Sequence, residues 1–98
     1  MLKISIIEGR HQRHLVLEGN LAAPWTEELK AICQETMADP LGRELVINLK
    51  DLTTISQYGE NLLLELMKRG VRLRGCGLFT KEILKHLARR SRANGDYR

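Results

Sequence analysis

Apolar and polar residues alternate over residues 2–6, and this period of two predicts a half-buried strand. Residues 8–13 are polar and include Gly9, which is typical of a hairpin loop. Residues 14–18 (HLVLE) are predicted to be the returning strand, which ends at Gly19. We expect the two strands to pair antiparallel.

A helix is predicted over residues 24–37. Pro24 suits the first helical turn, and Glu27 and Glu28 favour the positive end of the helix dipole. Apolar side chains then recur on one face at helical spacing: Trp25, Leu29, Ile32, Cys33 and Met37. The segment 39–42 (DPLG) ends the helix.

The central stretch, residues 45–67, predicts a buried strand, a polar turn and an amphipathic helix. The strand is rich in β-branched and apolar residues over 45–49. Residues 53–59 (TTISQYG) form the expected turn. The helix then carries its apolar face on Leu62, Leu63, Leu66 and Met67. We expect any working site in this turn, where a strand ends and a helix begins.

The last third of the chain predicts a fourth strand over residues 71–74, with Arg72 and Arg74 on its solvent side. Thr80 is expected to cap a third helix that continues to Arg89. Residues 1–90 are then one domain, and residues 91–98 are expected to be a disordered tail. The order β-β-α-β-α-β-α predicts an α/β fold with a mixed four-stranded sheet, parallel central strands and helices packed against it.

The 98 residues carry a formal net charge of +4 that is unevenly distributed. Residues 68–98 hold ten Lys or Arg and two acidic residues, whereas residues 1–67 hold six Lys or Arg and ten acidic residues. A basic end of this kind could bind nucleic acid. The candidate cations are Arg72, Arg74, Lys81, Lys85, Arg89 and Arg90. No aromatic residues lie among them for base stacking, and a solvated helix face is the favoured interpretation.

The sequence offers no catalytic or metal-binding constellation. Cys33 and Cys76 lack metal-like spacing and are expected to be free thiols of a cytoplasmic protein. The three histidines have no paired carboxylate or ligand spacing, so surface roles are favoured. No signal peptide or membrane span is predicted. We therefore expect no enzyme activity, no cofactor and no membrane insertion.

The strand–DLTTI–turn–Gly–helix segment, together with the order of elements over residues 12–88, resembles STAS domains, the sulfate-transporter and anti-sigma-factor-antagonist modules of bacteria. The resemblance implies a module that binds an anti-sigma factor and is switched by phosphorylation in a turn reading Asp-Ser-Ser/Thr-Gly. Ser56 matches the Asp position, Gln57 the phosphoacceptor and Tyr58 the next residue, and Gly59 alone is retained. Gln57 has no hydroxyl group, so the resemblance implies a binding role whose usual switch is lost or displaced.

On this interpretation, a regulatory partner docks on Ser56, Gln57, Tyr58, Gly59, Glu60 and Asn61. Ser56 and Thr54 are candidate displaced phosphosites, although capping of the helix is favoured for Ser56. Tyr58 is either an exposed anchor for the partner or a ring folded against the first helix. An accessory subunit of a transport or other multiprotein assembly is an alternative role. Members of the STAS family usually carry a further strand and helix after the third helix, so the resemblance also implies an open sheet edge here, which a second copy would cover in a homodimer.

Overall fold

The structure is a computed structural model and describes residues 1–38, 42–75 and 77–95. Its elements follow the predicted order β-β-α-β-α-β-α. They are β1 (Leu2–Glu8), β2 (Gln12–Leu21), α1 (Trp25–Met37), β3 (Glu44–Ile55), α2 (Gln57–Lys68), β4 (Arg72–Arg74) and α3 (Leu78–Gly95).

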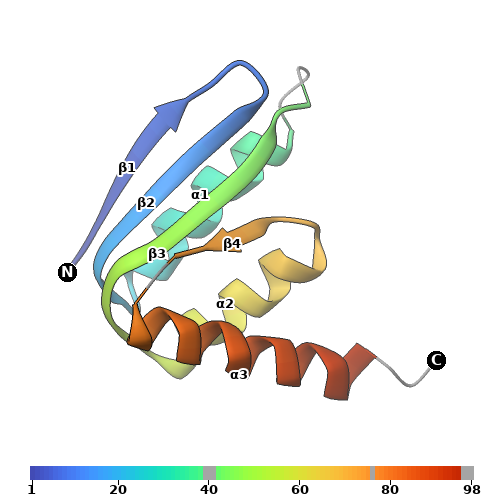
Figure 1. The fold of residues 1–98 in the computed structure, drawn as a ribbon. Coiled ribbons are helices and arrows are strands. Elements are labelled where there is room, and N and C mark those ends of the chain that lie inside the picture. The colour runs from blue at the N-terminus through green and yellow to red at the C-terminus, as the bar shows by residue number, and fades with distance from the viewer. Residues whose placement is uncertain (39–41, 76, 96–98) are drawn as a thin grey trace.

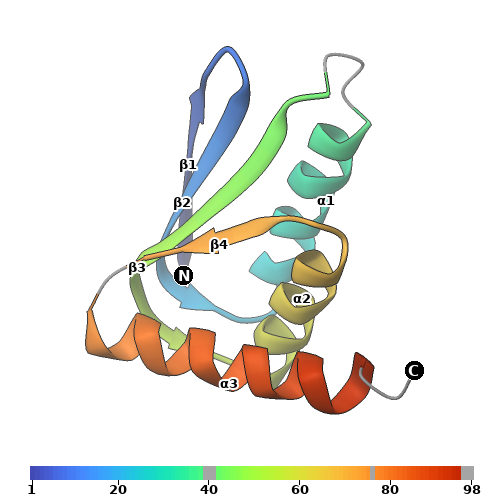
Figure 2. The same cartoon turned by 45° about the vertical axis from the view of Figure 1, so that its right-hand side comes forward.

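One mixed sheet has the strand order β1-β2-β3-β4. The pair β1/β2 is antiparallel, and the pairs β2/β3 and β3/β4 are parallel. Figures 1 and 2 show α1 and α2 against one side of the sheet, with α3 crossing the end at which β3 finishes. The predicted four-stranded α/β fold is confirmed.

The core lies between the sheet and the helices because each element presents one apolar face. Leu15 and Leu17 of β2 and Ile47 and Leu49 of β3 are fully buried on the helix side of the sheet. The helices contribute Leu29, Cys33, Leu62, Leu63, Leu66, Ile83 and Leu87. Alternation in the strands and the 3.6-residue period in the helices therefore predicted most of the core, whereas Met37, expected on the apolar face of α1, is exposed.

Two strands are longer than the sequence pattern predicted. β2 continues past Gly19 to Leu21, and β3 continues through the expected turn to Ile55. The Thr53 hydroxyl donates to the Gly19 carbonyl (3.1 Å), and the Thr54 hydroxyl donates to Asn20 Oδ1 (2.6 Å). These cross-strand hydrogen bonds accompany a pairing that includes two register shifts. The turn between β3 and α2 is therefore reduced to Ser56.

The two ends of α3 also differ from prediction. Thr80 lies inside the helix rather than at its cap, and its buried hydroxyl donates to the Leu49 carbonyl (3.1 Å). The helix continues to Gly95, beyond the end at Arg89 that the sequence pattern predicted. Arg92 and Ala93 have high helix propensity, which favours continuation without an apolar pattern. Residues 96–98 lie outside the described residues.

Candidate interaction site

The junction between β3 and α2 is fixed by Ser56. Its side-chain oxygen accepts a hydrogen bond from the Gly59 N–H (3.0 Å), which makes Ser56 the N-cap of α2. Its own N–H and hydroxyl donate to the Leu21 carbonyl at 3.0 and 3.3 Å. The capping role predicted for Ser56 is confirmed, and the cap also ties α2 to the end of β2.

Replacing Ser56 by Ala is expected to lower the free energy of unfolding by about 1 kcal/mol, because the Gly59 N–H loses its acceptor. Ser56→Thr is the control, since Thr is also an N-cap residue and keeps a hydroxyl that can accept from Gly59 and donate to Leu21. Urea denaturation monitored by circular dichroism measures both variants. Equal losses in Ser56→Ala and Ser56→Thr would contradict the capping account.

Gly59 allows α2 to approach the sheet closely. A Cβ atom at Gly59 would lie 2.4 Å from the Leu21 carbonyl oxygen and 2.9 Å from Leu21 Cγ. The first of these atoms belongs to the backbone, so it cannot move aside as a side-chain terminus would. Gly59 is thus required for packing, which gives its match to the STAS turn a physical reason in this chain.

Tyr58 projects from the first turn of α2 and is 60% exposed. Beside it, α1 and α2 border a hollow of about 140 Å³. The hollow is lined by Thr26, Glu27, Lys30, Tyr58, Asn61, Leu62 and Glu65. Thr26 is 2% exposed, and its hydroxyl has no hydrogen-bond partner among the described residues. Tyr58 thus combines an exposed ring with a position beside α1.

The other polar residues at the start of α2 make contacts within the protein. Gln57 is exposed, and its Nε2 donates to Asn61 Oδ1 (3.2 Å). Arg90 of α3 donates to Glu60 Oε1 and to Asn61 Oδ1, and His86 Nε2 lies 3.1 Å from Glu60 Oε1. Glu60 is therefore held against α3 rather than presented alone to solvent. The ring of His86 faces a carboxylate, a pairing that sequence spacing did not indicate.

The cations of the basic C-terminal third are partly neutralised. Arg72 pairs with Glu44 (2.9 Å), and Arg90 pairs with Glu60. Both belong to the set of cations considered for nucleic-acid binding. Their carboxylate partners lower the charge that this region offers to a phosphate backbone.

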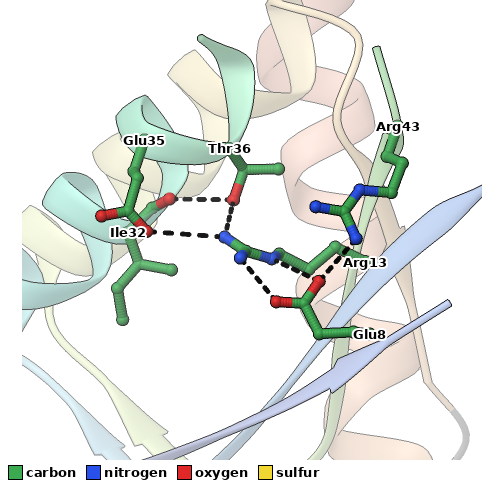
Figure 3. Close-up of polar contacts among 6 residues, drawn as sticks. All are labelled: Glu8, Arg13, Ile32, Glu35, Thr36 and Arg43. Carbon is green, nitrogen blue, oxygen red and sulfur yellow. Dashed lines mark hydrogen bonds and ion pairs between the residues drawn. The ribbon is translucent and has the colours of Figure 1, made fainter. Parts of the chain in front are cut away.

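A polar cluster at the other end of the sheet was not predicted. Arg13, at the start of β2, donates to both carboxylate oxygens of Glu8 in β1, at 3.1 and 2.6 Å (Figure 3). Its Nη1 donates to Thr36 Oγ1 of α1 (2.7 Å) and lies 3.7 Å from Glu35 Oε1. Arg43 also pairs with Glu8 (2.9 Å). The sequence pattern placed Glu8 and Arg13 in the hairpin loop, whereas both lie in strands and only residues 9–11 connect them.

Other candidate chemistry is limited in the described part of the chain. No group of three or more His, Cys, Asp or Glu side chains there could hold a metal ion. Cys33 is a free thiol, and burial raises its pKa to about 11. Cys76 lies outside the described residues. None of the described helices is both long and apolar enough to cross a bilayer.

No protein-family model matches the chain, and no curated protein sequence matches it. A solved structure of an uncharacterised DUF3478-family protein from Shewanella loihica PV-4 has a SpoIIAA-like fold. It is 18% identical to this chain, with a TM-score of 0.56, and the match covers 80% of this chain and 70% of that one. The chain has a SpoIIAA-like fold.

The crystal structure of Mglu contains a similar segment, with 20% identity and a TM-score of 0.59. The match covers 76% of this chain but only 19% of Mglu. Identities this low establish the fold alone. The SpoIIAA-like fold agrees with the STAS-like architecture predicted from the strand–turn–helix segment.

Proposed function

We propose that the protein is a non-enzymatic, STAS-like interaction module that binds a regulatory protein, such as an anti-sigma factor, through residues 56–59 and the first half of α2. The observation that supports this most is the exposed ring of Tyr58 in the first turn of α2, close to the Ser56 cap. The Ser56 cap and the contact of Gly59 with Leu21 hold that turn in place. A tyrosine side chain supplies a large contact area and has only two torsions to fix, so covering it costs little conformational entropy.

The hollow beside Tyr58 supports the same surface. Its lining includes Glu27 and Lys30, which supply charges of both signs, and the apolar side chain of Leu62. A partner side chain that enters the hollow gains apolar contact with Leu62 and contact with the charged side chains of Glu27 and Lys30. Docking then uses α1 and α2 together.

The charge at Gln57, the position that matches the family's phosphoacceptor, does not change when the module binds its partner. Gln57 cannot be phosphorylated, and the Ser56 hydroxyl is used by both the helix cap and the Leu21 carbonyl. A phosphate on Ser56 removes the proton that its hydroxyl donates to the Leu21 carbonyl, and the Thr54 hydroxyl donates to Asn20 Oδ1. Intact-mass measurement after co-expression with host kinases tests this point. Stoichiometric phosphate on residues 53–58 would overturn it.

Tyr58→Ala is expected to weaken binding of the partner about 30-fold, because an aromatic anchor contributes roughly 2 kcal/mol. The partner is captured from the native host, identified, purified and titrated by calorimetry. Phe79→Ala is the matched control, since Phe79 is an exposed aromatic residue (41%) on α3. An unchanged affinity for Tyr58→Ala would refute the docking site. If the captured partner were a subunit of a transport assembly and its binding depended on Tyr58, the docking site would be correct and the anti-sigma factor would be the wrong partner.

A further inference from the structure

The two edges of the sheet differ in how well they are protected. β4 forms one edge with only three residues, of which Arg72 and Arg74 are exposed charges. β1 forms the other edge with seven residues, and no described residue pairs with its outer side. Its pairing with β2 has no register shift, and its charged residues are Lys3 near its start and Glu8 at its end. Long, regular and apolar edges of this kind pair readily with another strand.

The hydrogen bonds at the ends of the β1/β2 pair identify the unused backbone groups. The Asn20 N–H donates to the Met1 carbonyl, and the Gly9 N–H donates to the Gln12 carbonyl. Hydrogen-bonded pairs alternate along an antiparallel ladder. The odd-numbered residues of β1 therefore bond to β2. The N–H and C=O groups of Leu2, Ile4, Ile6 and Glu8 point away from the sheet.

Side chains on β1 add an apolar surface beside these free backbone groups. Ile6 is 45% exposed on the helix side of the sheet, and Ile7 is 57% exposed on the opposite side. Ile4 is partly buried against the core. An added strand would bury the side chains of Ile6 and Ile7 and form hydrogen bonds with the free backbone groups. Apolar burial and backbone hydrogen bonding would therefore both favour pairing at this edge.

We propose that β1 pairs antiparallel with β1 of a second copy, about a two-fold axis that passes beside Ser5. This register uses all the free N–H and C=O groups of Leu2, Ile4, Ile6 and Glu8. It sets Ile4 opposite Ile6 of the second copy and joins the two four-stranded sheets into one. Lys3 lies opposite Ile7 of the second copy, so no like charges face each other.

The second copy fits because the strand is self-complementary in this register. A two-fold interface requires one surface to match itself, and the sequence Ile4-Ser5-Ile6 places a small polar residue between two isoleucines. Ser5 faces Ser5 at the axis without crowding, while the isoleucines pack on the helix side. This interface does not involve the turn at the start of α2. An experiment that excludes the β1 dimer would therefore leave the proposed docking site untouched, and the reverse also holds.

Light scattering is expected to give twice the 11.2 kDa chain mass at micromolar concentration, and Ile6→Pro is expected to give the monomer. Proline removes an N–H that points away from β2, so the hairpin keeps its own hydrogen bonds. Ile6→Lys, which keeps the N–H and adds a charge, is a second variant with the same expected result. Phe79→Lys, a matched change of an exposed apolar residue on α3, is expected to remain dimeric.

Cross-linking tests the register. Ser5→Cys places two thiols opposite each other in a pair without hydrogen bonds, a geometry that permits a disulfide. Lys3→Cys separates its two thiols by four residues along the strand and is expected to stay reduced. Both are made in a Cys76→Ser background, and Cys33 is buried. A monomeric wild type, a dimeric Ile6→Pro, equal cross-linking of both variants, or β1 occupied by a strand of another protein would overturn the proposal.

Discussion

Replacing Gly59 by Ala is expected to lower the free energy of unfolding by about 3 kcal/mol, the upper part of the usual range for overpacking. The added methyl group would lie 2.4 Å from the Leu21 carbonyl oxygen. Helix propensity alone favours Ala over Gly by roughly 1 kcal/mol, so the steric contact decides the sign. Relief requires α2 to move away from β2. This movement would weaken both hydrogen bonds from Ser56 to Leu21.

Urea denaturation of Gly59→Ala measures the loss as a lower midpoint at unchanged slope. Gln57→Ala is the matched control in the same helical turn, because Gln57 is exposed and its change is expected to cost no more than about 0.5 kcal/mol. If Gly59→Ala were as stable as Gln57→Ala, this would contradict the close contact of α2 with β2 at Gly59. Partner binding by any folded Gly59→Ala protein should also weaken, because Tyr58 is the adjacent residue.

The arrangement of elements follows from local patterns in this sequence. The period of two in residues 2–6, the amphipathic stripes near Leu29 and Leu63, and the alternation of strands and helices are properties of neighbouring residues. They predicted the topology and most of the core. Element ends were predicted less well, since β3 extends to Ile55 through hydrogen bonds between its threonines and β2, 34 residues away in sequence.

The features of the candidate site also fall into those that local sequence predicts and those that depend on tertiary contacts. The cap at Ser56 is a local motif, and the family resemblance drew attention to Gly59. The reason for Gly59 is a contact with Leu21 that depends on tertiary structure. The ion pair of Glu60 with Arg90 also could not be predicted from the sequence. The two residues are 30 positions apart, and no local pattern relates them. The Arg13 cluster was missed altogether, since its members come from four separate segments.

Arg13 acts on a helix that lacks a C-terminal cation of its own. The last turn of α1 has no basic residue, and the Arg13 guanidinium lies against Thr36 and Glu35 in that turn. A cation at this end of a helix interacts favourably with the macrodipole. Thr36 is 3% exposed, and its hydroxyl donates to the Ile32 carbonyl while it accepts from Arg13. The guanidinium therefore satisfies a buried hydroxyl and links α1 to the hairpin.

Arg13→Met is expected to lower the free energy of unfolding by about 2 kcal/mol, a value reduced from that of a fully buried pair because Glu8 is half exposed. A double-mutant cycle with Thr36→Val isolates the contact between β2 and α1, with a coupling energy of about 1 kcal/mol. Arg69→Met is the matched control, because its ion pair with Glu65 is exposed and is expected to contribute less than about 0.5 kcal/mol. Additive losses for Arg13→Met and Thr36→Val would mean that Arg13 stabilises the hairpin through Glu8 alone and not the end of α1.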